Sequence, residues 1–202
     1  MKLHKPFLFV TAALVSLTLN TGAYANGHGA SWNLVGGDSK VAFGSIKAGV
    51  VGESHRFNEL TGTVNDHGAA SIEIDLTSVN TGIEIRDTRM KSHVFEEKNP
   101  TGTLTANIDP KTMTELAPGA TSLIEVAGKL ALGDNTIDVN TKLFVAKLSA
   151  EKVMVTTDEM VMVGVESLGI TAGIDKLMGL AKLPSITPVS YTHLTLPTTP
   201  YV

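Results

Sequence analysis

The sequence predicts an all-β, antiparallel fold, either a barrel or a sandwich. From Ser31 to Val163, β-branched and aromatic residues alternate with polar ones, which is the period of strands with one buried and one wet face. Glycine and Asx residues separate several of these segments, as tight turns require. The chain of 202 residues is long enough for one barrel or sandwich with a sizeable core and short for two. We therefore expect one domain.

The clearest strand places Ile72, Ile74 and Leu76 on one face, because polar residues alternate with them. Hairpin turns are predicted at Asn65 to Gly68 and at Gly133 to Asn135, where the residue types tolerate positive φ. Further strands are predicted at Lys40 to Ile46, Leu60 to Val64, Gly102 to Ile108, Ser122 to Leu132, Thr136 to Lys147 and Lys152 to Val165.

Two segments break the alternation and predict helices. Between Thr81 and Phe95, apolar residues lie at roughly helical spacing among charged ones, which indicates one or two helical turns in a connection. Between Ser167 and Leu183, apolar residues recur at three and four positions, which predicts an amphipathic helix that Pro184 stops. Its apolar face suits packing on the barrel, or contact with a membrane or a partner.

The N-terminus has the pattern of an export signal. Basic residues at Lys2 and Lys5 precede an apolar run from Phe7 to Leu19 that is too short to span a bilayer, and Ala23 to Ala25 has the small-residue pattern of a cleavage site. We expect a signal peptide at residues 1–25 and a mature protein exported to a bacterial periplasm, with a membrane anchor as the alternative.

The C-terminal residues 190–202 are interpreted as a non-native tail, because they look like the translation of a sequencing-adapter read-through. A natural threonine- and proline-rich extension is the alternative. The barrel domain is accordingly assigned to residues 26–189, and the tail is excluded from the fold. If the natural last strand is missing, the barrel has an open edge that favours association between chains.

Composition and motifs argue against several classes of protein. The net charge is -4, with sixteen basic and twenty acidic residues and no long basic run, so nucleic acid is not an expected partner. The chain has no cysteine, and its histidines show no zinc-binding spacing. There is no G-x-S-x-G motif and no P-loop. We predict no catalytic residue, no metal site and no cofactor. A homodimer stays open.

One polar connection stands out after the strand end at Ser78 to Thr81. It holds Arg86, Asp87, Arg89 and Lys91 close together in sequence. Two interpretations are open: ion pairs and hydrogen bonds that fix the connection to neighbouring strand ends, with Phe95 capping the core, or a basic mouth that meets the polar head group of a ligand.

This connection resembles the signature of the YceI-like family. The matching pieces are Ser78 to Thr81, Arg86 and Asp87, Arg89 to Ser92, Phe95 and Pro100. The runs Ser39 to Phe43 and Phe57 to Val64 are similar to the family's first strand and second hairpin. The resemblance covers residues 31–189.

The resemblance implies a lipocalin-like antiparallel barrel, with a short helical connection after Thr81 and a helix near the C-terminus, that binds a long apolar ligand without covalent chemistry. A polyisoprenoid or an isoprenoid quinone would fit. We expect Trp32 to pack over one barrel end, and Arg86, Asp87, Arg89 and Phe95 to serve a head group or the structure. The residues expected to line the cavity by inward parity are Val41, Phe43, Ile72, Ile74, Leu76, Leu104, Ile124, Val126, Leu130, Val139, Leu143 and Val145.

Two alternatives remain at this point. One is an enzyme or stress factor that acts on an isoprenoid lipid, with Arg86 and His93 near the reactive head. The other is a structural or interaction protein whose barrel is filled by side chains, because inward aliphatic residues suit a solid core as well as a channel.

Overall fold

The computed structural model describes residues 31–95, 100–187 and 189–201, and for residues 187–201 it describes the backbone alone. The predicted signal peptide lies outside the described residues. The strands are β1 (Ser31–Leu34), β2 (Lys40–Lys47), β3 (Val51–Phe57), β4 (Leu60–Val64), β5 (Ala69–Asp75), β6 (Val79–Asn80), β7 (Thr101–Asn107), β8 (Thr121–Leu132), β9 (Asn135–Ser149), β10 (Lys152–Thr157), β11 (Val161–Gly164), β12 (Ile186–Thr187) and β13 (Val189–Tyr201). The helices are α1 (Glu84–His93), α2 (Lys111–Thr114) and α3 (Thr171–Ala181), with short 3-10 turns η1 (Gly36–Asp38) and η2 (Leu76–Ser78).

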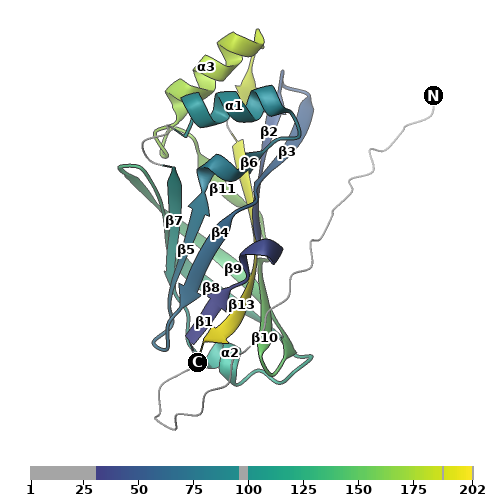
Figure 1. Cartoon of the computed structure of the whole chain (residues 1–202), viewed down its shortest axis with the longest axis vertical. Coiled ribbons are helices and arrows are strands. Elements are labelled where there is room, and N and C mark those ends of the chain that lie inside the picture. The colour runs from purple at the N-terminus through teal and green to yellow at the C-terminus, as the bar shows by residue number, and fades with distance from the viewer. Residues whose placement is uncertain (1–30, 96–99, 188, 202) are drawn as a thin grey trace, which may run out of the picture.

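The strands pair antiparallel in one sheet that closes into a barrel (Figure 1). The order is β1, β4, β5, β7, β8, β9, β10 and β13, and β13 pairs again with β1. Eight of the described strands therefore form a ring, and β2, β3 and β6 extend it from the other end of β13. The predicted all-β antiparallel barrel is confirmed.

The segment that the sequence analysis excluded from the fold forms strand β13. Its residues 195–198 pair with β10, while residues 193–195 pair with β2 and residues 198–201 with β1. The expected open edge is therefore not present in the described sheet. A strand forms here because the facing edges of β10, β1 and β2 carry backbone N–H and C=O groups that need partners. That these residues are non-native stays a prediction.

The two predicted hairpin turns are confirmed. The β8–β9 turn places Leu132 opposite Asn135. In the β4–β5 turn, Oδ1 of Asn65 accepts hydrogen bonds from the backbone N–H groups of His67 and Ala69 at 3.0 and 2.8 Å. Gly68 has a φ of 85°, and a Cβ atom there would lie 1.8 Å from the carbonyl oxygen of Ile108. This turn therefore requires glycine.

Both predicted helices are present, at the same end of the barrel (Figure 1). Helix α1 spans ten residues and ends within the predicted segment, while α3 begins four residues later than the predicted start and ends before Lys182, whose φ is 52°. The two helices pack closely because Gly173 of α3 lies against the end of α1. A Cβ atom at Gly173 would lie 2.3 Å from the carbonyl oxygen of His93.

Three elements differ from the sequence predictions. Strand β3 was not predicted, and it pairs with β2 through a turn at Ala48 and Gly49, both of which have positive φ. The predicted strand from Lys152 to Val165 is divided into β10 and β11, which both pair with β13. The short helix α2 was also not predicted, because four residues give too little periodicity to detect.

We expect removal of residues 193–202 to lower the Tm by about 10 °C or more. Several backbone hydrogen bonds at about 1 kcal/mol each would be lost, and 1 kcal/mol corresponds to about 2–4 °C in a chain of this size. The freed edges of β10, β1 and β2 should also cause self-association. Thermal melting and size-exclusion chromatography measure both effects against the full chain, and an unchanged Tm and elution volume would contradict the expectation.

Candidate functional site

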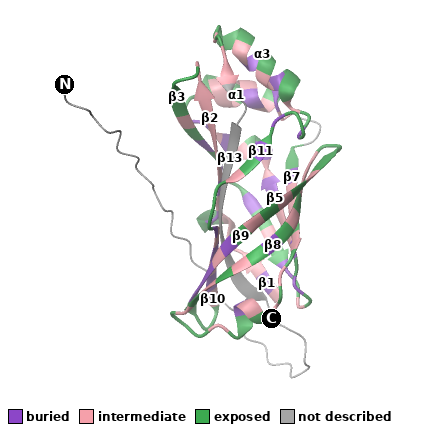
Figure 2. Cartoon of the chain, turned by 180° about the vertical axis from the view of Figure 1, so that it is seen from behind, coloured by how far each residue is buried: buried purple, intermediate pink, exposed green. Residues whose placement is uncertain are grey.

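A cavity of about 410 Å³ lies inside the barrel, and its lining extends from residues of α1 and α3 at one end to Met113 of α2. Its wall consists of side chains from β2, β3, β4, β5, β7, β8, β9, β10 and β11, and residues of α1 and α3 cover it. On β8 and β9, exposed residues alternate with less exposed ones, so one face of these strands turns to the solvent (Figure 2). The volume falls in the range of about 300–1,000 Å³ that is typical of small-molecule sites. The barrel interior is therefore hollow.

Small residues at inward positions explain why side chains do not fill this space. Ala70 pairs with Ala106, Ala106 with Gly128, and Gly102 with Ile74, and all of these residues line the cavity. Gly62, opposite Ile72, lines it as well. Cross-strand neighbours face the same side of a sheet, so one row across β5, β7 and β8 leaves almost no side-chain volume inside the barrel.

Most of the residues predicted to line a cavity do so. Ile124 and Val145 are the exceptions: Ile124 is half-buried against the core and Val145 is fully buried in it. Parity gives the side of the strand that a residue occupies, but not whether its side chain reaches the cavity or packs among its neighbours. Whether the others contact a ligand stays a prediction; the lining residues are Val41, Phe43, Ile72, Ile74, Leu76, Leu104, Val126, Leu130, Val139 and Leu143.

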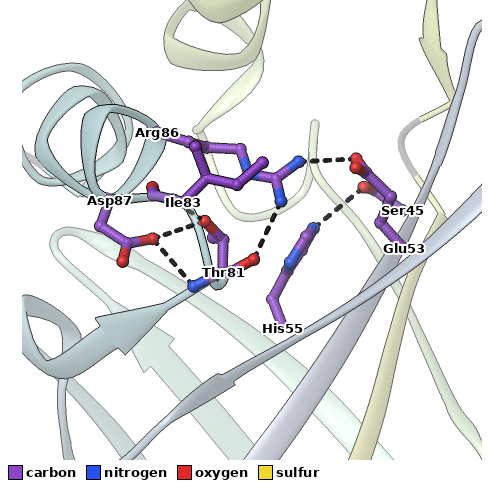
Figure 3. Close-up of polar contacts among 7 residues, drawn as sticks. All are labelled: Ser45, Glu53, His55, Thr81, Ile83, Arg86 and Asp87. Atoms are coloured by element: carbon purple, nitrogen blue, oxygen red, sulfur yellow. Dashed lines mark hydrogen bonds and ion pairs between the residues drawn. The ribbon is translucent and has the colours of Figure 1, made fainter.

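A polar cluster lies at the α1 end of this otherwise apolar cavity (Figure 3). Arg86 of α1 donates from Nη1 to Oε2 of Glu53 on β3 at 2.8 Å, and from Nη2 to the carbonyl oxygen of Thr81 at 3.0 Å. Asp87 accepts hydrogen bonds from the backbone N–H and the hydroxyl of Thr81 at 2.8 and 2.5 Å. These contacts fix α1 to β3 and to the end of β6. They correspond to the first of the two interpretations from the sequence, in which ion pairs and hydrogen bonds fix this connection to neighbouring strands. Arg86 also lines the cavity.

His55 of β3 lies beside this cluster and is buried, with 5% of its surface exposed. Its Nε2 is 3.3 Å from Oγ of Ser45. Its ring packs edge-on against Phe43 with a centroid distance of 5.3 Å, and Phe43 stacks on Phe57 at 5.0 Å. The histidine therefore continues an aromatic wall into the polar end of the cavity.

Two buried nitrogen atoms of the cluster have no hydrogen-bond partner within the described part of the chain: Nε of Arg86 and Nδ1 of His55. Burial, followed by the positive charge of Arg86, lowers the pKa of His55, so the imidazole is neutral at neutral pH. The hydrogen bond from Arg86 lowers the pKa of Glu53, so this carboxylate is ionised and offsets the guanidinium charge. The Arg86–Glu53 pair is therefore almost charge-balanced, and the cluster keeps two buried nitrogen atoms without partners among the described residues.

Of the remaining residues predicted for a head group or a reactive head, some line the cavity and others do not. Arg89 and Phe95 line the cavity, and Phe95 packs edge-on against Phe57 at 5.3 Å. Asp87 is not among the lining residues, because its carboxylate binds Thr81. His93 lies in the last turn of α1 and is also not among them.

Glu53 and His55 both line the cavity, although the sequence did not predict either of them as a site residue. They alternate with exposed residues and share the inward face of β3 with Phe57. Two polar residues at inward positions of a strand were the available signal, but it depended on recognising β3 as a strand.

The other end of the barrel is closed around Trp32, as expected. Trp32 is 1% exposed, and Nζ of Lys147 lies 4.7 Å from the centre of its ring. Lys147 is buried and donates from Nζ to the carbonyl oxygen of Met113 in α2 at 2.8 Å. This cation–π contact and hydrogen bond attach α2 to the barrel wall.

The described residues contain no group of three or more histidine, aspartate or glutamate side chains arranged to hold a metal ion. Among the helices formed by these residues, none has the length and apolar character needed to cross a membrane.

An antiparallel ring of strands with an apolar cavity and helices over one end defines a lipocalin-like barrel. The chain belongs to the YceI-like domain family, whose model matches residues 32–177. It is similar to a solved polyisoprenoid-binding domain from Saccharophagus degradans implicated in plant cell wall breakdown. The two are 32% identical with a TM-score of 0.83, and the match covers 85% of this chain and 99% of that one.

The fold is also similar to that of BcnA from Burkholderia cenocepacia. The TM-score is 0.62 at 17% identity, over 81% of this chain and 98% of that one. A comparison with curated protein sequences gave no match.

We expect Lys147→Met to change how stability depends on pH. Burial lowers the pKa of Lys147, whereas the unfolded lysine titrates near its ordinary value of about 10.4. Between these two values the unfolded chain binds more protons, so the free energy of unfolding rises with pH in that window, and the cost of burying the charge is fully present below it.

Urea unfolding at pH 7 and pH 10 measures this effect. The wild type should gain stability relative to Lys147→Met as the pH rises, while the exposed Lys142→Met should follow the wild type. A constant difference between the wild type and Lys147→Met at both pH values would contradict the expectation.

Proposed function

We propose that the protein binds an elongated apolar ligand, such as a polyisoprenoid or an isoprenoid quinone, in the barrel cavity, and carries or sequesters it in the periplasm without covalent chemistry. The observation that carries this proposal is the cavity of about 410 Å³ with its aliphatic wall. Burial of apolar chain contributes about 0.8 kcal/mol per methylene, so a slender hydrocarbon needs no charged contact for firm binding.

The similar domain from Saccharophagus degradans supports this ligand class, because it is described as polyisoprenoid-binding and the match covers 99% of that domain. The export signal predicted at residues 1–25 supports the periplasmic location.

The polar end of the cavity favours a neutral, oxygen-containing head group over a phosphate. Within the cluster, Glu53 already offsets the charge of Arg86 and His55 is neutral, so a phosphate that contacts these groups would meet little net positive charge. Lys47 and Arg89 also line the cavity, but they take no part in this ion pair. An uncharged carbonyl or hydroxyl oxygen would instead satisfy Nε of Arg86 and Nδ1 of His55, which lack partners in the described structure. Buried polar groups of this kind favour a ligand that pairs with them.

Binding without chemistry is also favoured over catalysis by the position of the titratable groups. The enzyme alternative needed His93 near the reactive head, and His93 does not line the cavity. Arg86, Glu53 and Asp87 are engaged in contacts that attach α1 to its neighbours. The cavity likewise favours a binding role over that of a filled structural barrel.

A substitution that fills the cavity tests the binding site. Ala106 lines the cavity and faces Gly128, so Ala106→Phe should occupy ligand space and lower the affinity for a fluorescent isoprenoid probe by about tenfold or more, equal to about 1.4 kcal/mol. The matched control is Leu123→Phe on the exposed face of β8. Native mass spectrometry of the wild type from a bacterial host should show a co-purified lipid. Equal probe affinity in the wild type and both variants would contradict the proposal.

Glu53→Gln tests the selectivity for the head group. The variant keeps the shape of residue 53 but leaves the charge of Arg86 without its offset, so it should bind an isoprenyl phosphate more tightly relative to an isoprenoid alcohol of equal length, by about tenfold. Competition titrations of both ligands measure the ratio, with Glu125→Gln, on an exposed position of β8, as the control. A wild type that prefers the phosphate, or an unchanged ratio in Glu53→Gln, would contradict the head-group argument.

A further inference from the structure

Exposed apolar side chains gather where the cavity reaches the surface. Ile83 and Ile85, at the start of α1, both line the cavity and are about half exposed, at 48% and 58%. Val50 and Val51 form the tip of the β2–β3 hairpin and are 83% and 49% exposed, and Leu180 lies exposed near the end of α3. We call these five residues the mouth rim.

The three elements that carry the mouth rim meet at one end of the barrel (Figure 1). The backbone N–H of Ala48, in the hairpin turn, donates to the carbonyl oxygen of Ser185, just after α3, at 2.9 Å. Arg86 joins α1 to the same hairpin through Glu53 at 2.8 Å. The cavity lining includes residues from all three places: Lys47 and Glu53, Ile83 to Arg86 in part, and Ala181 to Ile186 in part. The opening therefore lies among these elements.

The exposure of the mouth rim follows from its sequence. The hairpin turn has positive φ at Ala48 and Gly49, and Val50 and Val51 follow it at the exposed tip. Ile83 and Ile85 flank Glu84, the first residue of α1, and both line the cavity next in sequence to Arg86, which is bound to Glu53 of β3. Large apolar side chains left in water at one place favour burial against another apolar surface.

The segments that carry the mouth rim have a net positive charge, whereas the chain as a whole has a net negative charge. Segments 46–53, 81–95 and 171–187 hold six basic and four acidic residues, whereas the whole chain has a net charge of -4. Glu53 and Asp87 face Arg86 and Thr81 within the protein, so Glu84 and Asp175 are the acidic side chains of these segments that lie exposed. Arg86 is paired with Glu53, so the basic residues without this offset are Lys47, Arg89, Lys91, Lys176 and Lys182.

We propose that the mouth rim docks on a lipid bilayer that contains anionic phospholipids, so that the ligand passes between the bilayer and the cavity without crossing water. Apolar side chains bordered by lysine and arginine are the combination that binds a membrane interface, where the former enter the acyl boundary and the latter meet the phosphates. This inference rests on the proposed function for the transfer step, while the docking itself is measurable without any cavity ligand.

The experiment compares three forms of the full chain. The rim variant is Val50→Ser with Leu180→Ser, two exposed residues that do not line the cavity. The control variant is Leu123→Ser with Leu148→Ser, which removes two exposed leucines from β8 and β9. Co-sedimentation with vesicles of phosphatidylcholine and phosphatidylglycerol measures docking, and the transfer rate of a fluorescent isoprenoid probe from these vesicles measures loading. Binding of the same probe in detergent solution measures the cavity alone.

Docking predicts that the wild type and the control variant bind the mixed vesicles and lose binding as the salt concentration rises, while the rim variant binds at least about tenfold more weakly. The rim variant should load the probe more slowly from vesicles at unchanged probe affinity in detergent. Wild-type protein that ignores the vesicles, or equal binding by both variants, would overturn the proposal. Self-association that the rim variant alone loses, without vesicle binding, would overturn it in favour of a second copy of the chain.

The two proposals can fail separately. Vesicle binding that depends on the mouth rim, without any probe binding in detergent, would remove the proposed ligand and keep the docking surface. Probe binding in detergent without vesicle binding would keep the proposed function and remove the docking surface.

Discussion

The cavity depends on a constraint in the sheet: inward positions that face one another across neighbouring strands are occupied by residues with little or no side chain. An antiparallel ring of about eight strands has an interior that aliphatic side chains can fill. Here Ala70, Ala106 and Gly128 form one row across β5, β7 and β8, and Gly62 and Gly102 lie at inward positions on either side of β5. The larger residues around them, such as Ile72 and Leu104, then form a wall instead of meeting at the centre.

The hollow and the polar end act on different parts of a ligand. The aliphatic wall holds any slender hydrocarbon of suitable width, because apolar burial depends on area and not on direction. The cluster around Arg86 depends on direction, since its hydrogen bonds fix α1 to β3 and leave two buried nitrogen atoms without partners among the described residues. Affinity and selectivity are therefore placed in separate regions of the same cavity.

The sequence was enough to predict the strand pattern, both hairpin turns, both longer helices and most of the cavity lining, because each of these follows from a local period or a local turn. Strand β3 was missed, since Glu53 and His55 occupy inward positions where the alternation rule expects apolar residues. Strand β13 was excluded, and its Pro197 and Pro200 argue against a strand that has neighbours on both sides. Its pairing depends on the unpaired edges of distant strands, which no local pattern reports.

The contact between α1 and α3 has a consequence for sequence variation. Gly173 lies against the carbonyl oxygen of His93 with no room for even a methyl group. A residue with any side chain at this position would push α3 away from α1 and so separate the two helices that cover the cavity. Position 173 therefore limits how the sequence of this barrel can vary. Aliphatic residues of the strands can replace one another, whereas the close packing of α1 and α3 requires glycine at this position.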